Sequence, residues 1–139
     1  MRVFSQRSLK NLEGVHPDLV RVCEIALEKG DMDFTVIEGV RTIEKQREYV
    51  ARGASKTMKS YHLKHGDGYG HAVDLYPFFD GKLQGADRPK TTEERKRNED
   101  AWRKIAVAMK DAAAEVGVRI TWGGDWKSFV DMPHFQIEA

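Results

Sequence analysis

Two pairs of carboxylate and imidazole side chains stand where loops pass into predicted strands, and together they could hold a metal ion. The first pair lies in His71-Ala72-Val73-Asp74-Leu75-Tyr76, a segment whose composition predicts a strand. Because side chains alternate along a strand, His71 and Asp74 point to opposite faces and cannot both bind one ion. Asp74 shares its face with the small Ala72, which leaves space for a ligand, so the pattern favours Asp74 as the ligand and His71 as a structural residue.

The second pair is Asp131 and His134, three residues apart at the start of the last predicted strand. A catalytic zinc site commonly has three protein ligands and a water, and a nearby carboxylate takes the proton as that water attacks. One histidine, Asp74 and a second histidine would supply the ligands, and Asp131 would remain as the base. Spacing alone leaves this set open, because incidental polar pairs in loops are common and the chain has five histidines: His16, His62, His65, His71 and His134.

Composition indicates one globular domain, residues 1–139, since domains commonly contain roughly 100–200 residues. Hydrophobic residues make up 40% and charged residues 32%, and the net charge of +1 gives no reason to expect a nucleic-acid partner. The one cysteine, Cys23, excludes an internal disulfide and falls in an apolar stripe of helical spacing. We therefore expect Cys23 to be a buried, inert side chain.

The elements that must position these residues follow from periodicity and capping signals. Helices are expected from Pro17 to a stop at Gly30, over 43–51, and from a Thr91 capping box with Glu94 to Gly117. Strands are expected over 34–38, 71–76, 118–122 and 134–137, with Pro77 stopping the second one. Loops are expected over 54–70 and 81–90, and Gly123-Gly124-Asp125-Trp126 is expected to turn. This order predicts an α+β fold, in which helices pack on a small antiparallel sheet.

Several motifs resemble those of the zinc D-alanyl-D-alanine carboxypeptidase and dipeptidase family. Ser60-Tyr61-His62-Leu63 followed by Gly70-His71-Ala72-Val73-Asp74-Leu75 is similar to its Ser-x-His…Gly-x-Ala-x-Asp motif. Three further matches follow in the family's order: Glu38-Gly39-Val40-Arg41-Thr42, Gly123-Gly124-Asp125-Trp126, and Asp131-x-x-His134. The resemblance covers residues 34–137. Chain length and motif order are most similar to the phage endolysins of this family, which are L-alanyl-D-glutamate endopeptidases.

The resemblance implies a zinc metallopeptidase that cuts the L-alanyl-D-glutamate bond in the stem peptide of bacterial peptidoglycan during host cell lysis. In the implied roles, His62, Asp74 and His134 bind Zn²⁺, Asp131 is the general base, Arg41 steadies the substrate carbonyl and the oxyanion, and Ser60 and Gln46 line the substrate groove. An arginine suits its role because its guanidinium stays charged and offers a rigid fork of donors.

One departure from the family pattern makes His65 a rival ligand. Residues 64–69, Lys-His-Gly-Asp-Gly-Tyr, lengthen the connection between the first histidine and the Gly-x-Ala-x-Asp segment. His62 is favoured because Ser60 and Leu63 flank it as the motif requires, and because an inserted glycine-rich loop can bulge without moving its ends.

Alternatives to this function use the same residues differently. A D-alanyl-D-alanine carboxypeptidase would share the motifs, and a non-catalytic, zinc-stabilised cell-wall-binding module would share the ligands but need no spare Asp131. A nucleic-acid-binding domain would use Lys56, Lys59 and Lys64. The N-terminal residues show neither a signal peptide nor a membrane span. We therefore expect a monomer in the cytoplasm of the infected bacterial cell, without stable membrane insertion, that reaches the wall by an external release route.

Overall fold

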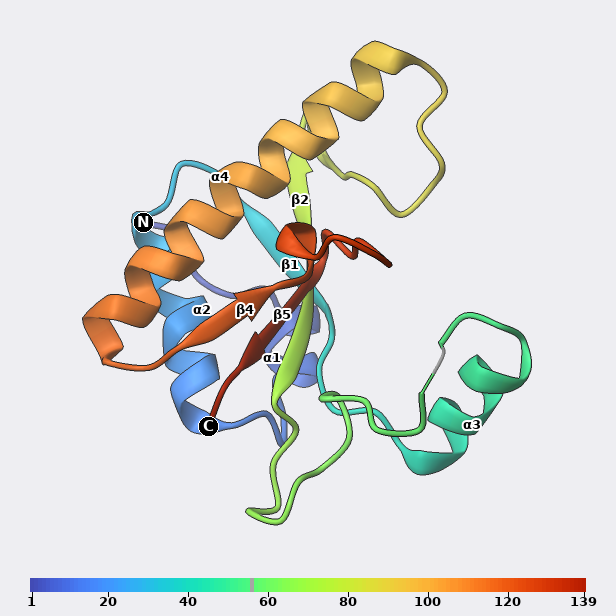
Figure 1. Ribbon diagram of the computed structural model, residues 1–139. Coiled ribbons are helices and arrows are strands. Elements are labelled where there is room, and N and C mark those ends of the chain that lie inside the picture. The colour runs from blue at the N-terminus through green and yellow to red at the C-terminus, as the bar shows by residue number, and fades with distance from the viewer. Residues whose placement is uncertain (56) are drawn as a thin grey trace.

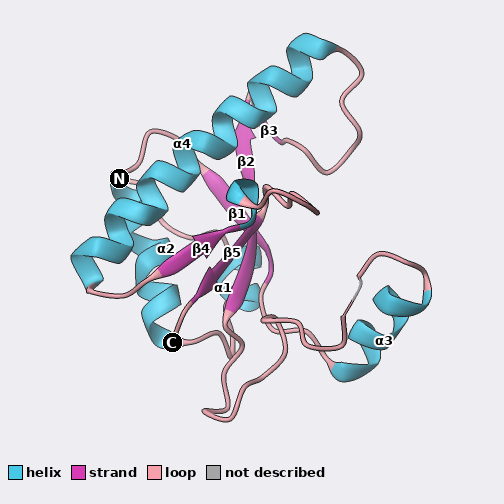
Figure 2. Cartoon of the chain, viewed as in Figure 1, coloured by secondary structure: helices cyan, strands magenta, loops and turns pink. Residues whose placement is uncertain are grey.

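The computed structural model describes residues 1–55 and 57–139, so Lys56 of the nucleic-acid alternative lies outside the described residues. Helices and a small sheet alternate along the chain (Figures 1 and 2). The helices are α1 (Gln6–Asn11), α2 (Pro17–Lys29), α3 (Ile43–Ala51) and α4 (Thr92–Val116). The strands are β1 (Phe34–Glu38), β2 (Ala72–Phe79), β3 (Lys82–Leu83), β4 (Ile120–Trp122) and β5 (His134–Ile137).

The sheet has the strand order β1-β2-β5-β4, and β3 forms a short hairpin with β2. Every pairing of these strands is antiparallel, which confirms the predicted α+β fold with a small antiparallel sheet. Since β2 lies between β1 and β5, residues from distant parts of the sequence meet side by side at the centre of the sheet.

Helices α2 and α4 pack against each other and cover one face of this sheet, whereas α3 stands apart from them (Figure 1). The predicted caps are present on α4: Thr91 Oγ1 accepts a hydrogen bond from the Glu94 amide at 3.0 Å, and Gly117 ends the helix with φ 86°. Only glycine adopts that left-handed conformation without steric cost. The Trp102 indole of α4 donates to the Leu75 carbonyl at 2.8 Å and so ties the helix to β2.

The hydrophobic core lies between these helices and the sheet. Val73 and Leu75 of β2 and Phe135 and Ile137 of β5 are fully buried in it. Cys23 of α2 belongs to the same cluster, and burial raises the pKa of its thiol to about 12. The prediction that Cys23 is buried is confirmed. Because side chains alternate along a strand, the residues between these core positions face the opposite side of the sheet.

The prediction that Pro77 stops the second strand is wrong, because β2 continues to Phe79. Proline lacks an N–H, so it interrupts a strand only where a neighbouring strand needs that donor. The Leu75 amide faces the β5 side, where it donates to the Pro133 carbonyl at 2.9 Å. Pro77 faces the same side two residues further on, beyond the end of the β5 pairing, and its carbonyl accepts from the Gln84 amide at 2.8 Å. The missing N–H therefore removes no hydrogen bond between β2 and β5.

Helix α1 was not predicted, although it supports the end of β1. The Ser8 hydroxyl accepts from the Val36 amide at 2.9 Å, and Asn11 Nδ2 donates to the carbonyls of Val36 and Ile37 at 2.9 and 3.1 Å. The pairing of β1 with β2 shifts register between Val36 and Glu38, as in a β-bulge. These side-chain contacts satisfy the backbone groups next to the bulge and fix how the chain leaves β1.

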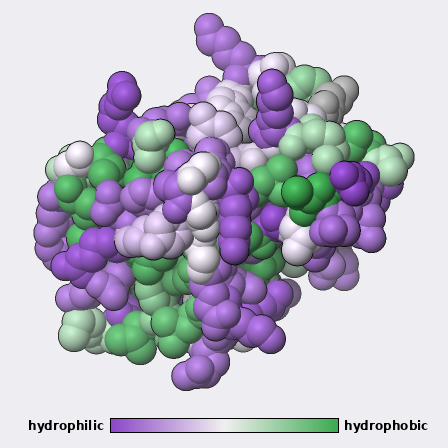
Figure 3. All heavy atoms as spheres, turned by 90° about the horizontal axis from the view of Figure 1, so that it is seen from below, coloured by the Kyte–Doolittle hydropathy of each residue, from purple (hydrophilic) through white to green (hydrophobic). Residues whose placement is uncertain are grey.

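Two smaller differences from the predicted elements concern the sheet. The strand expected over 118–122 is shorter, since β4 covers only Ile120–Trp122, and the hairpin strand β3 lies inside the loop expected over 81–90. In the described part of the chain, no helix is both long and apolar enough to span a membrane. Hydrophilic and hydrophobic residues are interspersed on the face seen in Figure 3.

Candidate active site

Three polar side chains form a row across the centre of the sheet. Asp74 of β2 lies opposite Glu38 of β1 on one side and opposite His134 of β5 on the other. Directly opposed residues of antiparallel strands have Cβ atoms about 4.5–5.5 Å apart, so neighbouring side chains in this row can touch. The row faces away from the helix-covered core, and antiparallel pairing thus joins two residues that are 60 positions apart in the sequence.

His62 joins this row from the loop that precedes β2. Its carbonyl accepts from the Arg41 amide at 2.8 Å, which fixes the loop against the chain that leaves β1. Its Nε2 lies 3.2 Å from Asp74 Oδ1, and His134 Nδ1 lies 3.6 Å from the same oxygen. One potential ligand atom from each of His62, Asp74 and His134 lies within 4.8 Å of the other two.

The hydrogen bonds on the outer sides of the two imidazoles determine what the inner sides can do. His62 Nδ1 lies 2.8 Å from the Gly39 carbonyl, which can only accept, so this nitrogen carries the proton. His134 Nε2 lies 2.7 Å from Gln136 Oε1 and must also be the donor. In each neutral ring the nitrogen that faces Asp74 is therefore an unprotonated acceptor.

The three inner atoms consequently form a cluster of acceptors without a proton between them. Asp74 Oδ1 is buried and has no hydrogen-bond partner within residues 1–55 and 57–139. A buried acceptor in that condition costs free energy unless a cation or a donor satisfies it. Two imidazole nitrogens and one carboxylate oxygen are a common ligand set for Zn²⁺. The residues present thus fit a divalent metal ion.

The pKa values of Asp74 and His134 also indicate that positive charge is favoured at this cluster. Burial alone would raise the pKa of Asp74, but hydrogen bonds and positive charge from His134 and His62, when these rings are protonated, outweigh it and hold that pKa well below its usual range. Burial alone would lower the pKa of His134, but Asp74, Gln136 and the nearby charge of Asp131 together raise it. Asp74 and His134 thus each favour the charged form of the other.

Asp131 lies at the edge of the same cleft and is held by its backbone. Its amide donates to the Gly123 carbonyl at 3.0 Å, and its carbonyl accepts from the His134 amide at 3.2 Å. A Cβ atom on Gly123 would lie 2.2 Å from the Asp131 carbonyl oxygen, so the glycine-rich turn can approach only because it has no side chain. Burial first, and then the charge of Asp74, raise the pKa of the Asp131 carboxyl.

Arg41 enters the cleft from the chain segment after β1. Its Nε donates to Glu38 Oε1 at 2.5 Å, its Nη1 donates to Gln46 Oε1 at 2.7 Å, and its guanidinium carbon lies 4.5 Å from the centre of the Tyr49 ring. Ser60 Oγ lies 3.4 Å from Arg41 Nη1 and also accepts from the His62 amide at 3.2 Å. Arg41 is therefore held in one orientation beside the histidine and aspartate cluster.

Gln46 lies behind Arg41 and does not border the open cleft. Its side chain is fully buried, and its Nε2 donates to Ser55 Oγ at 2.9 Å and to the Thr57 carbonyl at 2.5 Å. Ser60, by contrast, borders the cleft. Of the two residues expected to line a groove, one is exposed to it and the other supports Arg41.

His65 and His71 lie outside the cluster. The His71 Nε2 lies 2.7 Å from Asp67 Oδ2, and the two histidine rings stack with their centres 3.7 Å apart. His65 Nδ1 lies 2.9 Å from the Leu63 carbonyl. The residues inserted before β2 thus form a hydrogen-bonded bulge of their own, and the structure brings His62, rather than His65, to Asp74.

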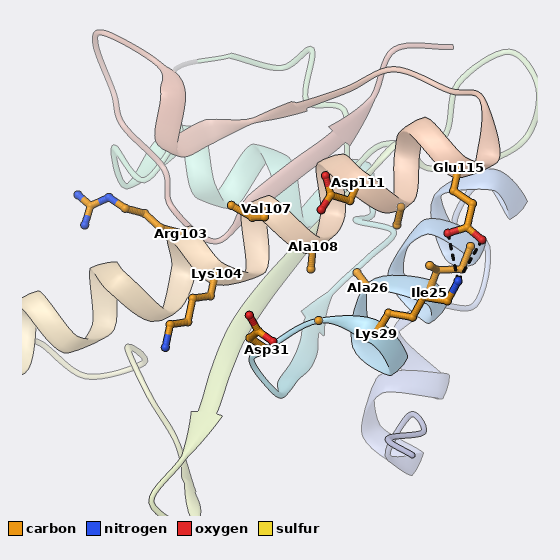
Figure 4. Close-up of a pocket in the computed structure, with 12 residues that line it drawn as sticks. Ile25, Ala26, Lys29, Asp31, Arg103, Lys104, Val107, Ala108, Asp111 and Glu115 are labelled. Atoms are coloured by element: carbon orange, nitrogen blue, oxygen red, sulfur yellow. Dashed lines mark hydrogen bonds and ion pairs between the residues drawn. The ribbon is translucent and has the colours of Figure 1, made fainter.

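The cleft around this cluster has a volume of about 690 Å³, with Arg41, Ser60, Asp131 and the exposed Phe129 among its lining residues. A second cavity, of about 360 Å³, lies between α2 and α4 (Figure 4). Its walls are largely apolar, and a Lys29–Glu115 ion pair of 3.2 Å crosses one end. No histidine is among the described residues that line this second cavity, whereas His62, Asp74 and His134 all line the larger cleft.

Sequence reasoning missed three contributors to the site. The Gly39 carbonyl orients His62, Gln136 orients His134, and the Trp126 ring lies 5.1 Å from the His134 ring. Gln136 had a signal in the sequence, because it lies two residues after His134 in a strand and must share its face. The Gly39 carbonyl had none, since a backbone contact across 23 residues leaves no pattern.

The fold and the acceptor cluster together form an α+β structure with a candidate three-residue metal site at the centre of its sheet. The family described as phage L-alanyl-D-glutamate peptidase matches residues 1–137. The chain belongs to this family, and the expectation that it is a peptidase is confirmed.

Individual relatives agree with this assignment. The chain is 30% identical to the L-alanyl-D-glutamate peptidase of Escherichia phage T5 over 131 residues, which cover 92% of this chain and 84% of that protein. It is 33% identical to the L-alanyl-D-glutamate peptidase of Listeria phage A118 over 110 residues, which cover 79% of this chain but only 32% of that longer protein. The crystal structure of the Serratia marcescens L-Ala D-Glu endopeptidase ChiX superposes with a TM-score of 0.79 at 42% identity, covering 96% of this chain and 88% of that one.

Proposed function

We propose that this protein is a zinc-dependent endopeptidase that cleaves the L-alanyl-D-glutamate bond in the peptidoglycan stem peptide, as an endolysin in phage-induced lysis. The family and the named relatives support the bond that is cut. The single observation that carries the metal is the buried Asp74 Oδ1 without a hydrogen-bond partner in the described residues, flanked by two imidazole nitrogens that can only accept. His62, Asp74 and His134 would hold the zinc ion.

When bound there, zinc lowers the pKa of a water molecule and polarises the scissile carbonyl group. Asp131 takes the proton from the attacking water and returns it to the leaving amine. Its position in the same cleft and its raised pKa support this role, because a carboxylate with a raised pKa is a stronger base. No covalent bond between the chain and the substrate is needed.

Arg41 stabilises the negative charge that develops on the carbonyl oxygen. Its contacts with Glu38, Gln46 and Tyr49 hold the guanidinium in place before substrate arrives, so little reorganisation is needed during the reaction. Ser60 borders the cleft next to this guanidinium and offers a hydroxyl to the bound peptide. Gln46 acts through Arg41.

The experiment that tests this function is digestion of purified muropeptides with the zinc-loaded protein, followed by mass spectrometry of the new termini. Cleavage at the L-alanyl-D-glutamate bond gives fragments with a new N-terminal glutamate. Release of free D-alanine would instead identify a carboxypeptidase, and undigested muropeptides with a folded, zinc-bound protein would favour a binding module. We also expect the protein to act as a monomer, which light scattering of the active protein measures.

A further inference from the structure

A chain of hydrogen bonds leads from the proposed metal site to a carboxylate that borders no part of the cleft. His134 Nε2 lies 2.7 Å from Gln136 Oε1, and Gln136 Nε2 donates to Glu138 Oε1 at 2.6 Å. His134 and Gln136 alternate along the inner strand β5 and Glu138 follows at its end, so the three residues share a face. Gln136 is buried, and its amide has these two partners at its two ends.

The carboxylate determines which way the Gln136 amide points. An amide can present either its oxygen or its nitrogen to His134, and the two orientations occupy nearly the same volume. A carboxylate can only accept a hydrogen bond, so the amide nitrogen must face Glu138 and the amide oxygen must face His134. That oxygen can only accept as well, so His134 keeps its proton on Nε2 and presents an unprotonated Nδ1 to Asp74.

Glu138 is itself held in position. Its Oε2 accepts from the Tyr61 hydroxyl at 3.2 Å, and its amide donates to the Arg119 carbonyl at 2.9 Å. Partial burial would raise the pKa of Glu138, but hydrogen bonds from Gln136, Thr121 and Tyr61 and the charge of Arg119 lower it. Glu138 therefore stays ionised and remains an acceptor, and Tyr61 is the residue next to His62 in the sequence.

We propose that Glu138 is a positioning residue of the metal site, which acts through Gln136 to fix His134 in the Nε2-protonated tautomer that leaves Nδ1 free to bind zinc. The inference rests on the proposed function in that zinc is the ion bound. Removal of Glu138 frees the Gln136 amide to turn its nitrogen toward His134. The histidine then moves its proton to Nδ1, which blocks the lone pair that faces Asp74. Loss of such an outer partner typically lowers metal affinity 10- to 100-fold.

The test compares zinc affinity, measured by competition with a chromophoric chelator, among five variants and the wild type. Glu138→Ala and Gln136→Met should each weaken zinc binding by roughly 10- to 100-fold. The double variant should bind zinc no more weakly than either single variant, because both changes disrupt the same chain of hydrogen bonds to His134. Glu138→Gln should lose much less zinc affinity, since the new amide oxygen still accepts a hydrogen bond from Gln136. Glu115→Ala, which removes a carboxylate ion-paired with Lys29 at the cavity between α2 and α4, should match the wild type.

A second readout follows the tautomer directly. Long-range proton–nitrogen NMR spectra of the metal-free protein, at a pH above the histidine titration, distinguish Nε2-protonated from Nδ1-protonated imidazole. Wild type should show His134 protonated on Nε2, and Glu138→Ala and Gln136→Met should show a shift toward Nδ1.

Unchanged zinc affinity together with an unchanged tautomer in either variant would overturn the inference, and so would additive losses in the double variant. If Glu138→Ala does not fold, Gln136→Met still decides the question, because it leaves the bonds of Glu138 to Tyr61 and to the Arg119 carbonyl in place. A wild type that binds no zinc would overturn the proposed function instead, whereas the tautomer spectra would still test the positioning role.

Discussion

Replacement of Asp131 should separate metal binding from catalysis. The variant Asp131→Asn keeps the side-chain volume and leaves His62, Asp74 and His134 unchanged, so zinc content should stay near one ion per chain. The carboxylate does not belong to the three-residue cluster, and its backbone is fixed by hydrogen bonds to Gly123 and His134 that an asparagine also makes. We therefore expect an intact fold and an intact metal site.

Catalysis should fall sharply in this variant. General-base help is typically worth 10²–10⁴-fold, which corresponds to about 3–5 kcal/mol of transition-state stabilisation. The amide cannot take a proton from water, so kcat on purified peptidoglycan should drop by roughly two to four orders of magnitude. Because burial and the charge of Asp74 raise the pKa of Asp131, the ionised carboxylate is disfavoured in the folded state relative to the unfolded chain. The neutral variant should thus unfold at an unchanged or higher Tm at neutral pH, measured without metal.

The assay pairs zinc content by elemental analysis with the initial rate of peptidoglycan hydrolysis. Asp125→Asn is the matched control, because Asp125 is an exposed carboxylate of the neighbouring turn that pairs with Lys110 at 2.7 Å and borders no part of the cleft. A near-normal rate for Asp131→Asn would refute the base role. Loss of zinc together with activity would make Asp131 a ligand, and one of the three proposed ligands would then have to leave the set.

Three further predictions concern the metal and its neighbours. Chelation should abolish lysis of cell walls, and added zinc should restore it. Full activity of a metal-free preparation would show that the proposed metal site is not needed for catalysis. His62→Ala should lose both zinc and activity, whereas His65→Ala should keep most of both, because of these two histidines only His62 reaches Asp74. Zinc content and hydrolysis rate are measured on both variants, and the opposite result would make His65 the ligand. Arg41→Lys should keep zinc but lose roughly 10²–10³ in kcat, since an ammonium cannot reproduce the guanidinium fork, and a wild-type kcat would remove Arg41 from the mechanism.

Local pattern was sufficient for the long elements of this fold. The limits of α2, α3 and α4 were predicted from apolar spacing, capping residues and glycine stops, because helix formation depends on residues three and four positions apart. The same reasoning could not recognise α1, because its six residues are too few to show helical periodicity. This helix contacts β1 through Ser8 and Asn11, and such long-range contacts leave no local pattern. Pro77 was misjudged because the cost of a proline depends on the neighbouring strand, which the sequence does not reveal.

The candidate site divides in the same way. The residue types, the alternation that separates Asp74 from His71, and the motif context that favours His62 over His65 were all available in the sequence. Only the tertiary structure placed Asp74 opposite His134, because strand register arises from pairings between residues far apart in the chain. It also decided that Gln46 is buried behind Arg41 and that Gln136 and Glu138 orient His134, since side-chain hydrogen bonds depend on distances of a few ångström that no spacing rule encodes.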